Sequence, residues 1–173
     1  LLQTGGGMSA QKAGLLTIGY AIAIIGFIRV GEKLLQKFGP RKPMIWGSLI
    51  VGFSFMLLMP TQLMTSDYTI LAIIAYTLFG LGLAFYATPS TDAALSNLPD
   101  SSAGSGSGIY KMASSLGAAL GVAISAGIFT ALSANNSSIL WLEGIISFQG
   151  RQDNLAVRQA AVIALGVNLL MVV

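Results

Sequence analysis

Two charged residues near the ends of apolar segments are the groups in this sequence best suited to gate or carry an ion. Asp92 lies about one helical turn beyond one apolar run, and Lys111 lies about one turn inside the next. A charge within or beside a membrane span is costly and is a functional candidate by default. The two side chains either form an ion pair that closes the inner side of a transport path, or have separate local roles. In the second case Asp92 caps a short helix and Lys111 extends its ammonium group to lipid headgroups.

The absence of two residue types excludes much other chemistry. The chain has no Cys and no His, which removes disulfides, thiol redox chemistry, Cys or His nucleophile–base pairs and the usual zinc sites. The segment "GSGSGIYKM" is not a phosphate loop, because Lys111 comes three residues after the last Gly and Met112 replaces the required Ser or Thr. We therefore expect no enzyme activity, no cofactor and no metal, and energy from an ion gradient or from another chain.

The overall composition indicates an integral membrane protein. Of the 173 residues, 54% are hydrophobic and only 9% are charged, whereas soluble domains carry about 25% charged residues. The net charge of +3 is concentrated in one segment between apolar runs, while nucleic-acid binding needs a basic face on a folded surface. The lipid bilayer is thus the expected partner, and nucleic acid is not.

Five apolar segments have the length expected of transmembrane helices, about 20 residues each. We predict an all-α bundle with spans at about 13–30, 43–60, 68–88, 108–132 and 156–173. The sequence opens without Met and ends inside an apolar run, so we read residues 1–173 as a fragment of a longer protein.

A basic segment sets the predicted orientation of these spans. Five of the nine Lys and Arg residues lie within residues 29–42, and none lies within 61–67. Because cytoplasmic loops carry excess Lys and Arg, we predict cytoplasmic loops at 31–42 and 89–106. The extracellular loops are then 1–12, 61–67 and 133–155. The basic segment either serves topology alone or has a further role at the inner side.

The spacing in this segment resembles a loop motif of the major facilitator superfamily, G-x-x-x-D-R-x-G-R-R. Glu32 and Gln36 stand where the motif has its first Gly and its Asp. Its later basic and Gly positions are matched by Lys37, Gly39, Arg41 and Lys42.

Three longer stretches are similar to the C-terminal half of the Nor-type multidrug efflux pumps of staphylococci. They are "GGGMSAQKAGLLTIGYAIAIIGFIRVGEKLLQ", "FGLGLAFYATPSTDAALSN" and "GIYKMASSLGAALGVAISAG". These pumps belong to the fourteen-helix drug/proton antiporters of the superfamily. The resemblance implies that the chain is the C-terminal bundle of a multi-pass protein of the bacterial plasma membrane, with helices ten to fourteen, and that its N-terminal bundle is absent.

The same resemblance implies a mechanism, to which two alternatives remain. Substrate would bind near the midplane between two rocking bundles, and hydrophobic, often cationic drugs would leave in exchange for protons. No carboxylate lies deep within the five spans, so the main proton site would belong to the N-terminal half, with Asp92 a secondary candidate. The alternatives are a uniporter or symporter of this fold, and a membrane component that does not transport.

A pocket for greasy cations needs aromatic and adaptable walls, because aromatic faces attract cations and Met fits varied shapes. The candidates for the substrate cavity are Tyr20, Tyr76, Tyr110, Met112 and Phe129. Tyr110 and Met112 are favoured, since by family analogy the fourth span lines the cavity.

Small residues recur every four positions along the fourth span, at Ala113, Gly117, Gly121 and Ser125. Such stripes let helices approach closely in lipid. We expect this stripe either to pack against another helix or to let a slim helix bend and slide during rocking.

The segment 139–148 is apolar but too short to cross the bilayer twice. Its two β-prone runs flank Glu143-Gly144, which favours a small extracellular hairpin. The alternative is an interfacial helix with Trp141 and Phe148 in the headgroup region.

Overall fold

The computed structural model describes residues 3, 9–61, 65–134 and 155–172. This part of the chain is helical without strands, as predicted. The elements are α1 (Ala10–Phe38), α2 (Arg41–Leu58), α3 (Thr65–Leu95), the short 3-10 helix η1 (Asp100–Ser102), α4 (Ala103–Ser133) and α6 (Leu155–Val172). The hairpin proposed for 139–148 lies outside the described residues.

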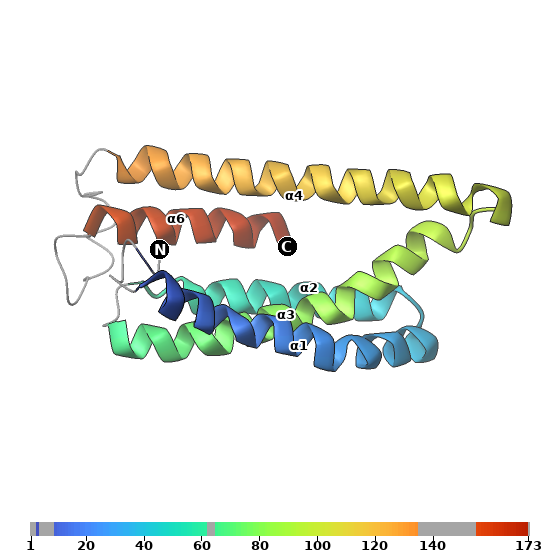
Figure 1. Ribbon diagram of the computed structural model, residues 1–173, viewed down its shortest axis with the longest axis horizontal. Helices are drawn as coiled ribbons and strands as arrows, with labels where there is room; N and C mark the ends of the chain where they lie inside the picture. The colour runs from blue at the N-terminus through green and yellow to red at the C-terminus, as the bar shows by residue number, and fades with distance from the viewer. Residues whose placement is uncertain (1–2, 4–8, 62–64, 135–154, 173) are drawn as a thin grey trace.

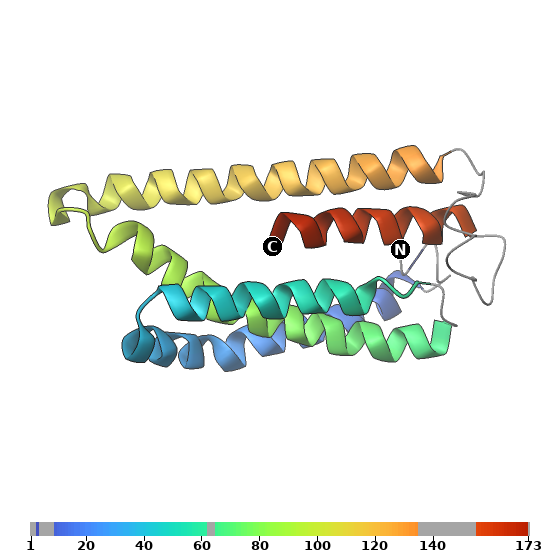
Figure 2. The same cartoon turned by 180° about the vertical axis from the view of Figure 1, so that it is seen from behind.

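The helices form two groups that lie side by side (Figure 1). Helices α1, α2 and α3 pack together, and α6 lies between α2 and α4, which places α4 at the outside of the bundle. Successive helices run in opposite directions, as a chain that crosses a bilayer repeatedly requires. The view from behind in Figure 2 shows the same separation of α4 and α6 from the other three helices.

The first inter-helix connection is shorter than the loop predicted at 31–42. Helix α1 continues through the basic segment to Phe38, so that only Gly39 and Pro40 separate it from α2. The segment contains Glu, Lys, Leu and Gln, which favour helix formation outside the bilayer. Gly39 has φ +72, a left-handed conformation that ends the helix.

The third helix also extends beyond its predicted end at residue 88. Helix α3 passes through Pro89, which is fully buried, and ends at Leu95. The hydroxyl groups of Ser90 and Thr91 donate hydrogen bonds to the carbonyl oxygen of Ala87 beside this proline. Beyond it, the final part of α3 turns away from α1 and α2 toward the start of α4 (Figures 1 and 2). Pro disrupts helix geometry at that position, because it lacks an N–H and its ring clashes with the preceding turn.

The distribution of apolar side chains is that of a bundle surrounded by lipid. The buried positions are mainly small, such as Ala23, Ala72 and Ala160, whereas Ile22 and Ile25 are 65% and 75% exposed. Large exposed apolar surfaces need an apolar environment. Among the described residues, four helical stretches are long and apolar enough to cross a membrane: Ala13–Phe38, Asp67–Leu95, Ala103–Ser133 and Leu155–Val172. Helix α2, which holds the remaining predicted span, has 18 residues and begins with two basic ones.

Glycines bring α3 into close contact with both of its neighbours. A Cβ added to Gly82 would lie 2.7 Å from Val51 Cγ2 and 2.8 Å from the Gly47 carbonyl oxygen on α2. A Cβ added to Gly80 would clash with the backbone oxygen of Tyr20 on α1. In lipid, where apolar burial gives no driving force between helices, such close approach supplies much of the packing. Helix α3 is therefore the centre of the three-helix group.

Candidate functional site

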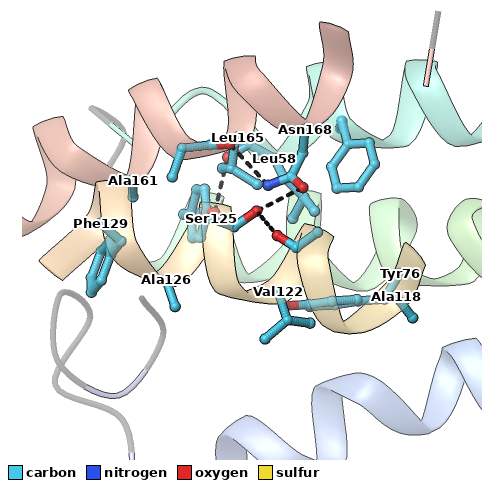
Figure 3. A pocket seen from close by; sticks show the side chains of 14 residues that line it. Leu58, Tyr76, Ala118, Val122, Ser125, Ala126, Phe129, Ala161, Leu165 and Asn168 are labelled. Atoms are coloured by element: carbon cyan, nitrogen blue, oxygen red, sulfur yellow. Dashed lines mark hydrogen bonds between the residues drawn. The ribbon is translucent and has the colours of Figure 1, made fainter. Parts of the chain in front are cut away.

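A cavity of about 640 Å³ lies between the two groups of helices and receives side chains from α2, α3, α4 and α6. Its walls are almost wholly apolar, with small residues contributed by α4 and α6 and large ones mainly by α2 and α3. Its lining comprises Phe55, Leu58, Tyr68, Tyr76, Ala118, Gly121, Val122, Ser125, Ala126, Phe129, Ala161, Ala164, Leu165 and Asn168. Figure 3 shows this cavity from close by. Its volume falls within the range of small-molecule sites, about 300–1,000 Å³.

One pair of polar side chains stands in the apolar wall (Figure 3). Ser125 Oγ on α4 donates to Asn168 Oδ1 on α6 over 2.9 Å, and also lies 2.8 Å from the Gly121 carbonyl oxygen. The Asn168 amide group donates to the Ala164 carbonyl oxygen over 2.9 Å. The pair therefore links α4 to α6 and presents hydrogen-bonding atoms to the cavity. An apolar pocket with a few placed polar groups is the usual form of a small-molecule site.

The aromatic candidates from the sequence divide between the cavity and other positions. Tyr76 on α3 and Phe129 on α4 line the cavity. Tyr20 lies on α1 with its ring 5.7 Å from that of Phe79, and Met112 is 68% exposed on α4. Tyr110 contacts Ser90 at the end of the bundle. None of Tyr20, Tyr110 and Met112 is among the residues that line this cavity, and the substrate roles of all five stay predictions.

Two aromatic residues of the cavity were not among the sequence candidates. Phe55 on α2 contacts the ring of Phe79 edge-on at 5.6 Å, and Tyr68 on α3 donates a hydrogen bond to the Leu58 carbonyl oxygen over 3.0 Å. Their positions in the sequence are ordinary for apolar helices. Only the way in which α2 and α3 face α6 brings them to one cavity.

The proposed gate residues Asp92 and Lys111 are both exposed and lie on different helices. Asp92 borders a second cavity, of about 410 Å³, together with Thr88 and Thr91 of α3 and Leu35 of α1. Lys111 lies near the start of α4. Within the described helices no ion pair joins Asp92 to Lys111 in this conformation, so their pairing in another state of a transport cycle stays a prediction.

A hydroxyl pair joins α3 to α4 close to these charges. Ser90 Oγ and Tyr110 Oη lie 2.7 Å apart and share a hydrogen bond. Ser90 directly follows the buried Pro89, and Tyr110 directly precedes Lys111. The sequence signal for this contact was Tyr110 itself, which was selected for its aromatic ring and not for its hydroxyl group.

The stripe of small residues on α4 lies partly in the cavity lining and partly outside it. Gly121 and Ser125 face the cavity, and Ser125 contacts α6. A Cβ added to Gly117 would meet nothing within 4 Å, and Ala113 is exposed. No residue of α4 is buried among the described parts of the chain. Packing of Ala113 and Gly117 against another element stays a prediction.

The residues of the basic loop motif surround the turn between α1 and α2. The ammonium groups of Lys37 and Lys42 lie 5.2 and 5.4 Å from the centre of the Phe38 ring. Arg41 is exposed at the first position of α2, after Gly39 and Pro40. The motif residues are thus gathered at one end of the bundle.

A buried arginine at the opposite end was overlooked by the sequence interpretation. Arg158 on α6 is only 6% exposed, and its Nε donates to the Thr61 carbonyl oxygen over 2.7 Å. The Thr61 hydroxyl group donates to the Arg158 carbonyl oxygen over 2.9 Å. A charged residue in the first turn of an apolar span was the available signal, because such residues mark functional or packing sites. The reciprocal bonds join the end of α2 to the start of α6.

Comparison with known proteins agrees with this architecture. Residues 2–150 match the Major Facilitator Superfamily. The chain is 46% identical over 157 residues to the quinolone resistance protein NorB of Staphylococcus aureus strain MRSA252, an alignment that covers 85% of this chain and 34% of that protein. It is 45% identical over 157 residues to NorB of strain Newman, with the same coverage of both proteins.

The alignments with the NorB proteins cover most of this chain but only part of each relative. The chain spans about a third of the length of the curated relatives it matches. The family match covers most of the described helices, and the outward-facing apolar side chains require a lipid environment. The chain therefore belongs to the Major Facilitator Superfamily, as a segment that crosses the bacterial plasma membrane several times.

Proposed function

We propose that this chain is the C-terminal bundle of a multidrug efflux transporter that exports hydrophobic, often cationic compounds in exchange for protons. The observation that carries the proposal is the apolar cavity with its single Ser125–Asn168 polar pair. The relatives named as quinolone resistance proteins support the same class of activity. The transporter class also argues against an enzyme, and we propose that the bundle uses no cofactor.

The cavity suits the proposed substrates in shape and chemistry. Tyr76 and Phe129 present aromatic surfaces from opposite helices, and aromatic faces attract cations. Asn168 and Ser125 offer hydrogen bonds to a substrate that has entered the apolar space. The small side chains of α4 and α6 leave room for compounds of different outline. Broad selectivity follows, because apolar contact discriminates weakly between similar shapes.

Transport requires a second bundle, which we assign to the N-terminal part of the longer protein. In this superfamily substrate lies near the membrane midplane between two bundles that rock around it. Helix α4 has an extensive uncovered surface, since none of its described residues is buried. We propose that this surface meets the N-terminal bundle and lines the transport path.

The proton gradient is the proposed energy source. The described helices hold their acids near helix ends, at Asp67 and Asp92 of α3 and at Glu32 of α1. A carboxylate at the midplane, which would carry a proton across, must then belong to the N-terminal bundle. Asp92 and Lys111 act at the inner gate in this proposal, with Asp92 a secondary proton site.

The test is ethidium efflux by the full-length transporter from energised cells, corrected for the amount of protein in the membrane. We expect Asn168→Leu to reduce efflux several-fold, because it removes the hydrogen-bonding group and fills part of the cavity. Ile25→Ala, at a 75% exposed position of α1 outside the cavity lining, is the control and should transport normally.

A protonophore separates the proposed exchange from uniport. Collapse of the proton gradient should abolish efflux against a concentration gradient. Efflux that continues downhill at an unchanged rate would indicate a uniporter, and normal efflux by Asn168→Leu would exclude this cavity from the substrate path. No efflux by the wild-type protein at all would favour a membrane component that does not transport.

A further inference from the structure

The turn between α1 and α2 carries a compact group of basic and aromatic side chains, here termed the basic corner. Its members are Lys37, Phe38, Arg41, Lys42 and Trp46. Gly39 adopts its left-handed conformation at this turn, which folds the end of α1 against the start of α2. The corner is thereby built from residues on both sides of a connection of only two residues.

The two lysines of the basic corner share one aromatic ring. Their ammonium groups lie 5.2 and 5.4 Å from the centre of the Phe38 ring, and this ring meets Trp46 edge-on at 5.5 Å between centroids. Cations are attracted to aromatic faces at such distances. Both ammonium groups therefore contact one ring at this turn, and Arg41 adds a third basic residue at the first position of α2.

No acidic side chain in the described part of the protein is paired with these charges. Within the described helices no ion pair joins Lys37, Arg41 or Lys42 to an acid. Glu32, the nearest acid in the sequence, lies more than one turn earlier on α1 and is also exposed. Three cations without an acid repel one another, and an external anion placed among them would relieve that repulsion.

The residue types of the basic corner are those expected at the headgroup region of a bilayer. The basic corner lies at the connection between two bundle helices, and α2 carries no charged residue after Arg41 and Lys42. Trp46, one turn further along, is 40% exposed, and Phe38 is 37% exposed. Tryptophan prefers the boundary between headgroups and hydrocarbon. The order from basic groups to exposed aromatic rings therefore matches the order from phosphate to acyl chain in a phospholipid.

We propose that the basic corner is a binding site for an anionic phospholipid. Lys37, Arg41 and Lys42 surround its phosphate group, and the exposed faces of Phe38 and Trp46 pack against its glycerol and upper acyl chains. The bound lipid holds the α1–α2 connection at the membrane surface. This site is separate from the substrate cavity, and its occupation does not depend on the transport function proposed above.

Trp46 supplies a direct reporter of the lipid beside it. The measurement uses the full-length protein with every Trp except Trp46 replaced by Phe, in vesicles of phosphatidylcholine with a minor fraction of phosphatidylglycerol. Either lipid is brominated in turn, because bromine quenches only nearby tryptophan. We expect brominated phosphatidylglycerol to quench Trp46 more strongly, at equal mole fraction, than brominated phosphatidylcholine does.

Charge-matched variants test whether the site is discrete. Each basic side chain near an anionic surface strengthens attraction about fivefold, so Lys37→Gln/Lys42→Gln should bring the quenching ratio of the two lipids close to unity. Arg29→Gln/Lys33→Gln removes the same charge from exposed positions of α1 that do not contact Phe38, and should keep the preference. An equal fall in both double variants would overturn the proposal in favour of diffuse attraction to the membrane.

Two further measurements complete the test. Inorganic phosphate, in excess and at constant ionic strength, should leave the lipid preference intact; loss of the preference would mean a general phosphate site instead of a lipid site. Native mass spectrometry of the protein with all its tryptophans should find retained phosphatidylglycerol, and fewer copies in Lys37→Gln/Lys42→Gln. Equal retention in both proteins would contradict the assignment even if the single-Trp protein fails to fold.

Discussion

The hydroxyl groups of Ser90 and Tyr110 lie 2.7 Å apart and form a side-chain hydrogen bond between α3 and α4. The contact stands immediately after Pro89, where α3 turns away from α1 and α2. Its two residues are close in sequence to the charges proposed to act at the inner gate, because Ser90 precedes Asp92 by two positions and Tyr110 directly precedes Lys111. A hydrogen bond at this point couples the direction of the α3 end to the position of α4.

We expect Ser90→Ala and Tyr110→Phe each to weaken this coupling. Hydrogen bonds between membrane helices contribute about 0.6 kcal/mol on average in double-mutant cycles. The free energy of unfolding of the full-length protein should fall by about that amount in each single variant, and the double variant should lose little more. Fully additive losses would show that the two hydroxyl groups do not interact.

Asp92→Asn and Lys111→Met should each impair ethidium efflux, because each leaves a lone charge near the inner gate. The double variant should recover part of the loss, since a lone desolvated charge is more costly than a missing pair. The structure has the two side chains unpaired within its described residues, so recovery would place the pair in another conformation. Normal efflux by both single variants would remove the pair from the mechanism.

Glycine positions on α3 and α4 should differ in their tolerance of a side chain. Gly82→Ala is expected to destabilise the protein by about 1–3 kcal/mol, because its Cβ would overlap Val51 and the Gly47 backbone. Gly117→Ala has open space and should not lower thermal stability, because Ala favours a helix more than Gly does. Gly117→Leu should then reduce transport without loss of folded protein if this part of α4 meets the N-terminal bundle; full transport would mean that it faces lipid.

Arg158→Leu should separate the end of α2 from the start of α6. The change removes a hydrogen bond from a charged donor to the Thr61 carbonyl oxygen, and such bonds contribute about 1.5–3 kcal/mol. Denaturation of the full-length protein measures the loss. Arg29→Leu, at an exposed site of α1, is the control. Equal stabilities of the two variants would mean that the Thr61–Arg158 bonds have no net effect.

The sidedness of the bundle can be tested by labelling, because this segment of the protein contains no Cys. In the full-length protein with any other Cys removed, an impermeant thiol reagent outside intact cells should miss Gln36→Cys and label Gln62→Cys. The basis is the excess of Lys and Arg in cytoplasmic segments. The opposite labelling pattern would reverse the predicted orientation of every span.

The membrane location and the helical fold class followed from the sequence, because about 20 apolar residues with few charges can cross the bilayer in any packing arrangement. The ends of the helices were less predictable. The basic segment reads as a loop by its charge, yet α1 continues through it to Phe38, since Lys, Glu and Gln are good helix formers outside the bilayer. Likewise, α3 passes through Pro89 before it ends.

Which faces of the helices meet was decided only by the tertiary structure. In water, an apolar stripe identifies the buried face, but in lipid both faces are apolar and the pattern is lost. The stripe at Gly117 was therefore as good a packing candidate as Gly80 or Gly82, although only the latter two lie against neighbouring backbones. The pairing of Ser125 with Asn168, across 43 positions of sequence, arises for the same reason from the packing of α4 on α6. Sequence determines that these helices enter the membrane, whereas steric fit between their backbones determines the cavity that they line.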